Sequence, residues 1–195
     1  MDLRIGLSHY HSKYEEELAS KTKMLEFLNS YKNPFNRQLA VGHFTASAFL
    51  LNSDKTKFLM MHHAKLGKWL QPGGHCDGNS NVLAVAIREA QEESGIPDIQ
   101  PISTQIYDID IHFIPANEQE PEHYHYDVRF LLKTINNDSF TINSEAKELK
   151  WLEFVTEIPV EMALDNSVIR MIKKAAVSVL PKLQDHIIDQ NNFSK

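Results

Sequence analysis

The chain has 195 residues, of which 42% are hydrophobic and 24% are charged, which is typical of one globular domain or of one domain with an appendage. Its formal net charge of −6 argues against a general binder of nucleic acids or anionic membranes, because such proteins need a basic surface. A single cysteine, Cys76, excludes an internal disulfide, and no apolar run reaches the ~18 residues of a membrane span, so we expect a cytoplasmic protein.

The first third of the chain predicts a helix, a linker and two strands. Apolar residues recur at helical spacing over Tyr14–Leu28, and the Asn- and Pro-containing stretch Ser30–Gln38 is typical of a linker. Ala40–Leu51 is rich in β-branched and aromatic residues, as strands are, and Lys57–His63 follows as a second strand. The turn-forming residues Asn52–Lys55 between them predict a hairpin.

The remainder of the chain predicts one central helix, further strands and a helical tail. The central helix covers Ser80–Ser94, with Ser80 or Asn79 as its N-cap and Gly95 as its C-terminal stop. Strands are expected at roughly 102–114, 122–133 and 149–154, and a helix interrupted near Pro181 is expected over 166–190. Strands around a central helix, with helices at both ends, predict a mixed sheet covered on its faces, an α/β/α sandwich.

Three glutamates of the central helix, Glu89, Glu92 and Glu93, lie on one face, because residues three and four apart are neighbours on a helix. Clustered carboxylates repel one another unless a cation lies between them, and Mg²⁺ and Mn²⁺ prefer oxygen ligands. The alternative is a solvated acidic face. The preceding Gly73-Gly74 turn favours a metal site, because bare glycine backbone allows a metal or a phosphate to approach closely.

The stretch Gly74–Ile96 resembles the Nudix box, whose pattern is Gly, five residues, Glu, seven residues, then Arg-Glu-apolar-any-Glu-Glu-any-Gly-apolar. Gly74 takes the first position, and the segment from Arg88 to Ile96 takes the whole second half in register. Ser80 stands where the pattern has its first Glu, and nearby Asp77 is a candidate to replace it. The resemblance implies a Nudix-type α/β/α sandwich over 39–195, preceded by an N-terminal helical extension and linker over 1–38.

The resemblance also implies a reaction, the hydrolysis of the pyrophosphate bond of a nucleoside diphosphate linked to another group. The cofactor would be Mg²⁺ or Mn²⁺, held by Glu89, Glu92, Glu93 and the main-chain carbonyl of Gly73. Glu89 would be a metal ligand or would assist as a base, and Arg88 would orient the glutamates.

An additional general base of such enzymes often lies on a loop ahead of a late strand, where this chain has Glu145 and Glu148, of which we choose Glu145. The alternative for Glu145 is an ordinary solvated carboxylate. Cys76 is expected to be a small loop side chain and not a nucleophile, because carboxylate and metal chemistry needs no thiolate.

Two predicted strands alternate between apolar and polar residues. If they pair, one face of the sheet combines Asp108, Asp110, His112, His123, His125, Asp127 and Arg129. The first interpretation is a wet outer face. The second, which we prefer, is a substrate cleft with Arg129 on a phosphate and His125 or Asp127 on a ribose or leaving group. The third is an extra metal site of His112, His123, His125 and Asp110, since imidazole suits Zn²⁺.

The expected partner is a small phosphorylated molecule, a nucleoside diphosphate derivative, and the N-terminal helix is a candidate contact for a homodimer. A catalytically silent Nudix-fold nucleotide sensor is the alternative function. The complete set of Arg88, Glu89, Glu92 and Glu93 argues against a sensor, which has no need of clustered carboxylates. An isomerase on a related fold would need a reactive cysteine in a different setting from Cys76.

Overall fold

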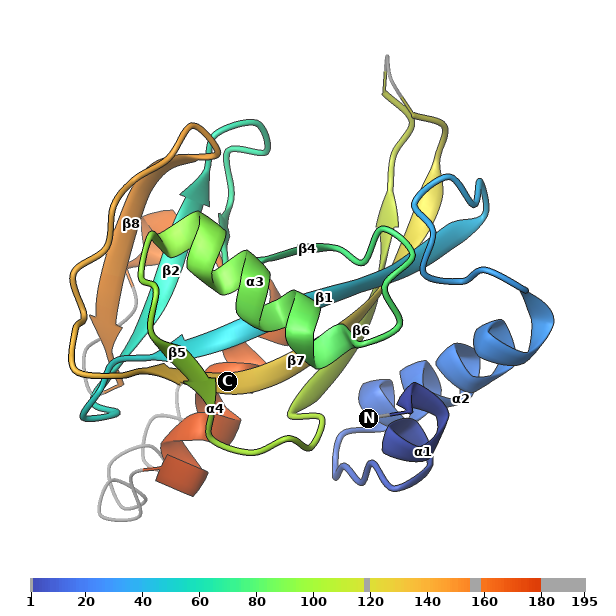
Figure 1. Cartoon of the computed structure of the whole chain (residues 1–195), viewed down its shortest axis with the longest axis horizontal. Helices are drawn as coiled ribbons and strands as arrows, with labels where there is room; N and C mark the ends of the chain where they lie inside the picture. The colour runs from blue at the N-terminus through green and yellow to red at the C-terminus, as the bar shows by residue number, and fades with distance from the viewer. Residues whose placement is uncertain (1, 118–119, 155–158, 180–195) are drawn as a thin grey trace, which may run out of the picture.

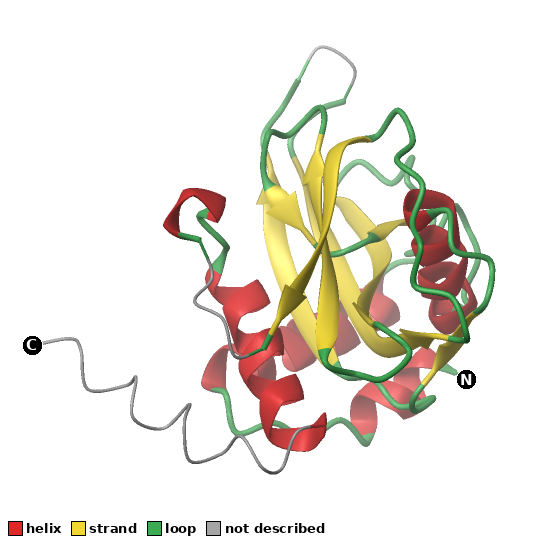
Figure 2. Ribbon diagram, turned by 90° about the vertical axis from the view of Figure 1, so that its left-hand side faces the viewer, coloured by secondary structure: helices red, strands yellow, loops and turns green. Residues whose placement is uncertain are grey.

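The structure, a computed structural model, describes residues 2–117, 120–154 and 159–179 and has helices on both faces of one sheet (Figure 1). Figure 2 shows α3 on one side of the sheet and α4 on the other, which confirms the expected α/β/α sandwich. The helices are α1 (Leu3–Ser8), α2 (Glu15–Ser30), α3 (Val82–Ser94) and α4 (Asn166–Val179), and a 3-10 turn, η1, covers Val160–Met162. The strands are β1 (Gly42–Leu51), β2 (Lys57–His63), β3 (Trp69–Leu70), β4 (Gly73–His75), β5 (Ile99–Pro101), β6 (Asp108–Ile114), β7 (His123–Thr134) and β8 (Ala146–Glu153).

The sheet is mixed because its two central strands, β1 and β7, run parallel while every other pairing is antiparallel. The β1–β7 ladder runs the whole length of β1, from Gly42 opposite Tyr124 to Leu51 opposite Lys133. The other edge of β1 pairs with β4 and, at its end, with β2. The other edge of β7 pairs with β6 and β5. Two parallel strands therefore begin together at one end of the sheet.

The alternation of side chains along β1 supplies both hydrophobic cores, because successive residues of a strand point to opposite faces. Phe44, Ala46, Ala48 and Leu50 join the cluster beneath α1, α2 and α3. Phe49 and Leu51 join the cluster that α4 covers. His43, Thr45 and Ser47 also lie on the α4 side of the sheet, and all ten residues of β1 are buried.

Several predicted boundaries were wrong. The strand expected from residue 102 begins only at Asp108, and the short strands β3, β4 and β5 and helix α1 were not predicted. The N-cap of α3 is Asn81, and not Ser80 or Asn79. The predicted hairpin exists only at its turn, where Leu51 pairs with Phe58, because β2 then leaves β1 and pairs along its length with β8. The expected helix beyond residue 179 lies outside the described residues.

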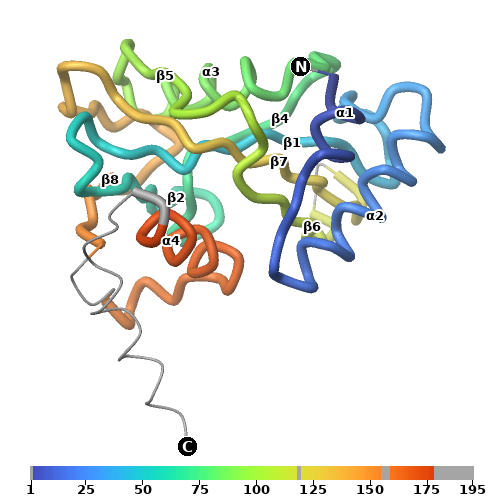
Figure 3. Tube along the Cα trace, turned by 90° about the horizontal axis from the view of Figure 1, so that it is seen from below, coloured from blue at the N-terminus to red at the C-terminus, as the bar shows by residue number. Residues whose placement is uncertain are grey.

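The N-terminal helices pack against the sheet beside α3, as the view in Figure 3 shows. Their apolar residues belong to the main core, and the ring of Phe27 stacks on that of Tyr126 at 4.1 Å between centroids. The division of the chain into an extension over 1–38 and a domain over 39–195 therefore stays a prediction. In the structure, residues on both sides of this boundary belong to one hydrophobic core. In the described part of the chain, no helix is both long and apolar enough to cross a membrane.

A buried ionic cluster ties the N-terminal helices to the sheet and to α4. Glu17 of α2 accepts hydrogen bonds from Tyr10 (2.5 Å) and from Lys174 of α4 (2.8 Å). Asp108 of β6 accepts from Lys174 (3.0 Å) and from Arg170 (2.8 and 3.0 Å). Glu17 and Asp108 are fully buried, so these charges are shielded from water and depend on one another.

Candidate active site

Helix α3 carries the predicted glutamates, and its ends are fixed by local chemistry. Asn81 caps the N-terminus through its side-chain oxygen, which accepts from the amide of Ala84 (3.4 Å). Gly95 ends the helix with φ of 70°, a left-handed conformation that favours glycine. The buried face of α3 includes Val82, Val85, Ala86, Ala90 and also Glu93.

Glu93 lies inside the protein and holds the glycine turn. Its side-chain oxygen accepts a hydrogen bond from the backbone amide of Gly73 (2.9 Å), and only 3% of the residue is exposed. Burial raises the pKa of Glu93 to about 8, the hydrogen bond from Gly73 opposes that rise, and the neighbouring charges of Glu89 and Glu145 add to it. A solvated acidic face, the alternative from the sequence, does not describe this residue.

Arg88 bridges the other two glutamates. It lies 2.6 Å from the carboxylate of Glu89 and 2.9 Å from that of Glu92, and it also donates to the carbonyl of His75 (3.3 Å). The side chain of Glu89 is 12% exposed, whereas that of Glu92 is 57% exposed. Burial is the main cause that raises the pKa of Glu89. Glu89 also lies against Gly74, where an added Cβ would be 2.5 Å from its carboxylate oxygen.

Glu145 lies beside these glutamates although it is more than 50 residues away in the sequence. Its carboxyl group is close enough to raise the pKa of both Glu93 and Glu89. Asn143 fixes this loop, since its side chain donates to the carbonyl of Glu92 (3.0 Å) and accepts from the amide of Glu145 (2.9 Å). The structure therefore brings together the three box glutamates, Gly73 and the loop carboxylate.

This donor set fits a hard divalent cation, because carboxylates and a backbone carbonyl offer oxygen atoms only. Burial and the neighbouring carboxylates raise the pKa values of Glu89 and Glu93. A bound cation would stabilise the ionised form of both groups. In the described ranges, no three of these carboxylates bring oxygen atoms within 4.8 Å of one another. Arg88 accounts for this in part, because it holds Glu92 on the exposed side of the helix.

The loop between Gly74 and the helix departs from the box pattern, because Ser80 stands where the pattern has its first Glu. Neither Ser80 nor the nearby candidate Asp77 contacts the glutamate cluster through a hydrogen bond or ion pair observed among the described residues. Ser80 and Asp77 are both exposed. Asp77 lies 3.9 Å from the side chain of Arg37, whereas Arg88 pairs with glutamates of its own helix. The hypothesis that Asp77 replaces the missing glutamate beside Arg88 is therefore not supported by the contacts. Cys76, in the same loop, is buried, and burial raises the pKa of its thiol to about 12, which disfavours the reactive thiolate.

The two alternating strands do pair, and their polar residues share the face of the sheet opposite α3. Asp108 lies opposite Arg129, Asp110 opposite Asp127 and His112 opposite His125. Arg129 is 3% exposed and donates to Asp127 (2.7 Å), Asp110 (3.1 Å) and Asp108 (3.2 Å). A phosphate could reach this guanidinium only by displacing a buried carboxylate.

Asp127 is equally enclosed. It accepts hydrogen bonds from Thr45 (3.0 Å) and from Ser47 (2.8 and 2.9 Å) of β1, besides that from Arg129. Asp127 and Arg129 therefore join β1, β7 and β6, and contact with a ribose or a phosphate stays an untested prediction for both. His125, two residues earlier on β7, is half-buried and lies among other histidines.

The sequence interpretation missed His43 and His75, which the sheet brings to His123 and His125. The rings of His43 and His75 lie 5.0 Å apart, and each lies within about 5 Å of the ring of His125. A histidine inside the predicted strand Ala40–Leu51 was a signal for His43, but only strand pairing shows its neighbours.

Comparisons with known proteins agree with this geometry. The model of the NUDIX domain matches residues 41–168. A protein of Lactococcus lactis subsp. cremoris (strain MG1363), named a probable DHNTP pyrophosphohydrolase, is 31% identical over 122 residues, which are 61% of this chain and 69% of that protein.

Solved structures show the same fold. A Caenorhabditis elegans Ap4A hydrolase in a binary complex superposes with a TM-score of 0.54 at 20% identity, over 69% of this chain and 95% of that one. A NUDIX family hydrolase from Clostridium perfringens has a TM-score of 0.50 at 24% identity, over 69% of this chain and 97% of that one. The family match over 41–168, on a chain that retains the second half of the box, shows that this chain belongs to the Nudix family of pyrophosphohydrolases.

Proposed function

We propose that this chain hydrolyses the pyrophosphate bond of a nucleoside diphosphate derivative, using Mg²⁺ or Mn²⁺ held by Glu89, Glu92, Glu93 and the carbonyl of Gly73. The observation that carries the proposal is the contact of buried Glu93 with Gly73 on one side and with Glu145 on the other. A divalent cation bound there would neutralise phosphate oxygens and lower the pKa of a water molecule.

The roles of the surrounding residues follow from their contacts. Arg88 orients Glu89 and Glu92 by pairing with both. Glu145 is exposed at the rim of the cluster, where its carboxylate can accept a proton from the attacking water. Asn143 keeps Glu145 at this place by bonding both to α3 and to the amide of Glu145.

The name of one similar protein, a probable DHNTP pyrophosphohydrolase, supports cleavage of a pyrophosphate bond, and the name of another refers to Ap4A. DHNTP and Ap4A are therefore the first compounds to test on this chain, beside nucleotide sugars and nucleoside triphosphates. A cytoplasmic location and a homodimer stay predictions.

The test is the release of phosphorylated products from this panel with Mg²⁺ or Mn²⁺, for the wild type and for Glu93→Gln. We expect turnover of one substrate class, and a fall in kcat of more than about 10–100-fold in the variant, the loss typical of changes around metal ligands, because Glu93→Gln would remove a charged ligand itself. Glu26→Gln, an exposed glutamate on α2, is the matched control and should keep the wild-type rate.

Two outcomes would contradict the proposal. Equal rates for Glu93→Gln and the wild type would exclude the box cluster as the active site. Tight binding of one compound without turnover of any, with every divalent cation supplied, would instead favour the nucleotide sensor.

A further inference from the structure

Five histidines gather at the end of the sheet where the parallel strands β1 and β7 begin. We define the histidine cluster as His43 of β1, His75 of β4, His112 of β6 and His123 and His125 of β7. They meet because His43 lies opposite His125, His75 opposite Thr45 and His112 opposite His125 in the strand ladders. Their neighbouring rings lie 4.8–5.3 Å apart between centroids.

Three of these side chains converge as metal ligands would. His43, His123 and His125 each offer a ring nitrogen, and the three atoms lie within 4.8 Å of one another. Among the described residues this is the only group of three or more His, Cys, Asp or Glu that does so. The metal site considered from the sequence combined His123 and His125 with His112 and Asp110, but these last two side chains do not belong to the group that converges. Asp110 is bonded to Arg129 (3.1 Å), and the side chain of His112 is 42% exposed.

His43 is buried without the hydrogen bonds that its ring needs. It is 1% exposed, and neither of its ring nitrogens has a hydrogen-bond partner in the described part of the chain. A buried polar atom without a partner is destabilising, so such an atom calls for a ligand or a bound water. The Nε2 atom of neighbouring His75 is also buried and unpartnered.

His123 is already oriented for coordination. Its Nδ1 lies 2.8 Å from the carbonyl oxygen of Pro121, which accepts only if Nδ1 carries the proton. Its Nε2 then presents a lone pair, and this atom is 3.1 Å from Nε2 of His125. A backbone carbonyl that fixes the far nitrogen of a ligating histidine is the usual support of such a ligand.

Burial also favours the neutral form, which metals bind, in two of the three proposed ligands, His43 and His125. Burial first, and then the neighbouring imidazoles, lower the pKa of His43 to about 4 and that of His125 to about 2. Neutral rings without a carboxylate in the group are a nitrogen donor set, which suits a late first-row transition metal and not Mg²⁺.

We propose that His43, His123 and His125 form a second metal site, which binds one Zn²⁺ or a similar late transition-metal ion, with His75 next to the open coordination position. This site is separate from the glutamate cluster. His43 and Ser47, the residue opposite Gly73, are four residues apart on β1, or about 13 Å along the strand. The bound ion would join the starts of β1 and β7, and it does not depend on the proposed pyrophosphatase activity.

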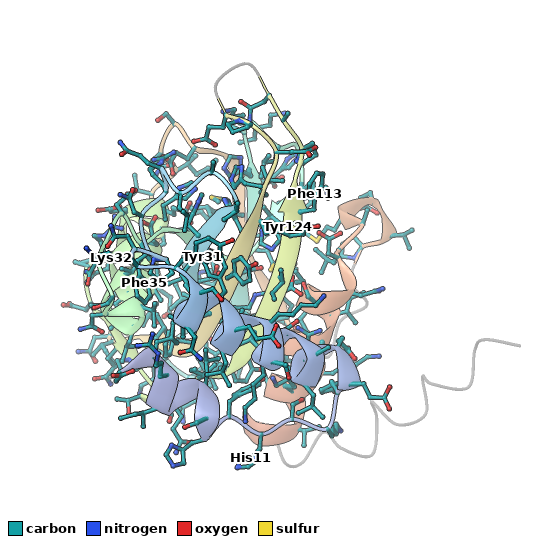
Figure 4. All side chains as sticks on the ribbon, turned by 90° about the vertical axis from the view of Figure 1, so that its right-hand side faces the viewer. His11, Tyr31, Lys32, Phe35, Phe113 and Tyr124 are labelled. Atoms are coloured by element: carbon teal, nitrogen blue, oxygen red, sulfur yellow. The ribbon has the colours of Figure 1, made fainter. Side chains whose placement is uncertain are left out.

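One of the three proposed ligands, His123, also lines a surface pocket. This pocket, of about 430 Å³, is lined by residues 37–40, Glu120, Pro121 and His123. On the opposite face of the β6–β7 hairpin, Phe113 and Tyr124 lie together, with ring centroids 5.5 Å apart (Figure 4). The alternation of the two strands therefore separates an aromatic face from the histidine face.

The test is a titration of the full chain, stripped of metal, with Zn²⁺ in competition with a chromophoric chelator. We expect one ion per chain in the variant Glu89→Gln/Glu92→Gln, which weakens the glutamate cluster and so isolates the second site. His43→Gln and His123→Gln should each weaken this binding by about 100-fold or more, beyond the ~10–100-fold typical of changes around the ligands. His11→Gln, at an exposed histidine, is the matched control.

X-ray absorption at the zinc edge of the loaded wild-type chain gives a second measurement, which needs no variant to fold. A first shell dominated by nitrogen at about 2.0–2.1 Å, with imidazole scattering, is the expected result. An oxygen-dominated shell, or equal affinities for His43→Gln, His123→Gln and His11→Gln, would overturn the proposal. So would the absence of stoichiometric binding.

Discussion

Gly73 and Gly74 are adjacent residues, but a methyl group added to each would meet a different part of the site. At Gly74 the new Cβ would lie 2.5 Å from the carboxylate oxygen of Glu89, the movable end of a side chain. We expect Gly74→Ala to fold with nearly wild-type stability while Glu89 is displaced, so that kcat falls by about tenfold or more, because displacements near 1 Å reduce rates strongly. Steady-state kinetics and a thermal melt measure the two effects separately.

Gly73→Ala is the matched comparison, because there the Cβ would lie 2.7 Å from Cα of Ser47 in β1. Backbone cannot move aside as a side chain does, so we expect this variant to lose about 1–3 kcal/mol of stability, as overpacked cores do. If Gly74→Ala proved the less stable of the two, the close approach of Glu89 to the glycine turn would be refuted.

Single residues also show how far the sequence alone could predict the site. Arg88, Glu89, Glu92 and Glu93 follow from a fixed spacing, and the structure places all four on α3. The shared face of the three glutamates was only partly right, because Glu93 lies on the buried face of α3 and Glu92 on its exposed side. The surroundings of Arg129 could not be predicted in the same way. The alternation along β7 gave the direction of its side chain, but its burial depends on Asp108 across the ladder and on the packing of α4.

At the scale of elements, the side chain of Asn143 and a backbone hydrogen bond from Thr141 to Ser94 hold the loop between β7 and β8 against α3. Asn143 bonds the carbonyl of Glu92 (3.0 Å) and the amide of Glu145 (2.9 Å). We expect Asn143→Ala to release Glu145 from Glu93 and to lower kcat, with a loss of only about 1 kcal/mol of stability, the net value of a typical hydrogen bond. Because the loop carries no predicted contact with the substrate, KM should change little.

Asn137→Ala controls for the loss of an amide elsewhere in the same connection, since Asn137 bonds the amide of Ser139 and not α3. A change in KM without a change in kcat for Asn143→Ala would mean that the loop binds substrate and does not position the base. Equal kinetics for both variants would remove Glu145 from the proposed mechanism.

Pairings between elements were predicted unevenly, for a physical reason. Two neighbouring segments with matching alternation favoured the β6–β7 pairing, whereas its register comes from the structure. The parallel β1–β7 ladder joins strands about 80 residues apart, and no local pattern states which strands will meet. His43 and His75 escaped prediction because their neighbours depend on that ladder and on the short strand β4.

At the scale of the whole molecule, α1, α2, β6 and α4 depend on a shared set of buried charges. Tyr10 and Glu17 come from the N-terminal segment, Asp108 from β6, and Arg170 and Lys174 from α4. The family model matches residues 41–168, so this cluster attaches the described flanking residues, 2–40 and 169–179, to the common domain. Removing one charge should therefore destabilise the molecule as a unit.

Asp108→Asn tests this coupling through the dependence of stability on pH. Burial by itself raises the pKa of Asp108, but hydrogen bonds from Arg170 and the charges of Arg129 and Lys174 outweigh it, so the folded-state pKa lies below the usual value. A carboxyl group with a lowered folded-state pKa stabilises the protein above its unfolded pKa of about 3.9, and this stability is lost as the pH falls through the folded-state pKa. We expect Asp108→Asn to lose about 3–5 kcal/mol at pH 7, as happens when a buried pair loses one partner.

The same variant should also flatten the acid limb, because Asn takes up no proton. Between about pH 5 and the acid transition, free energies of unfolding from urea titrations should decline less steeply than in the wild type, by up to about 1.4 kcal/mol per pH unit. Asp98→Asn, at an exposed aspartate, should leave both quantities nearly unchanged. Lys174→Met, with Lys173→Met on the exposed side of α4 as its control, gives a milder test if Asp108→Asn does not fold. Parallel acid limbs for Asp108→Asn and the wild type would mean that this cluster does not couple the flanking helices to the sheet through charge.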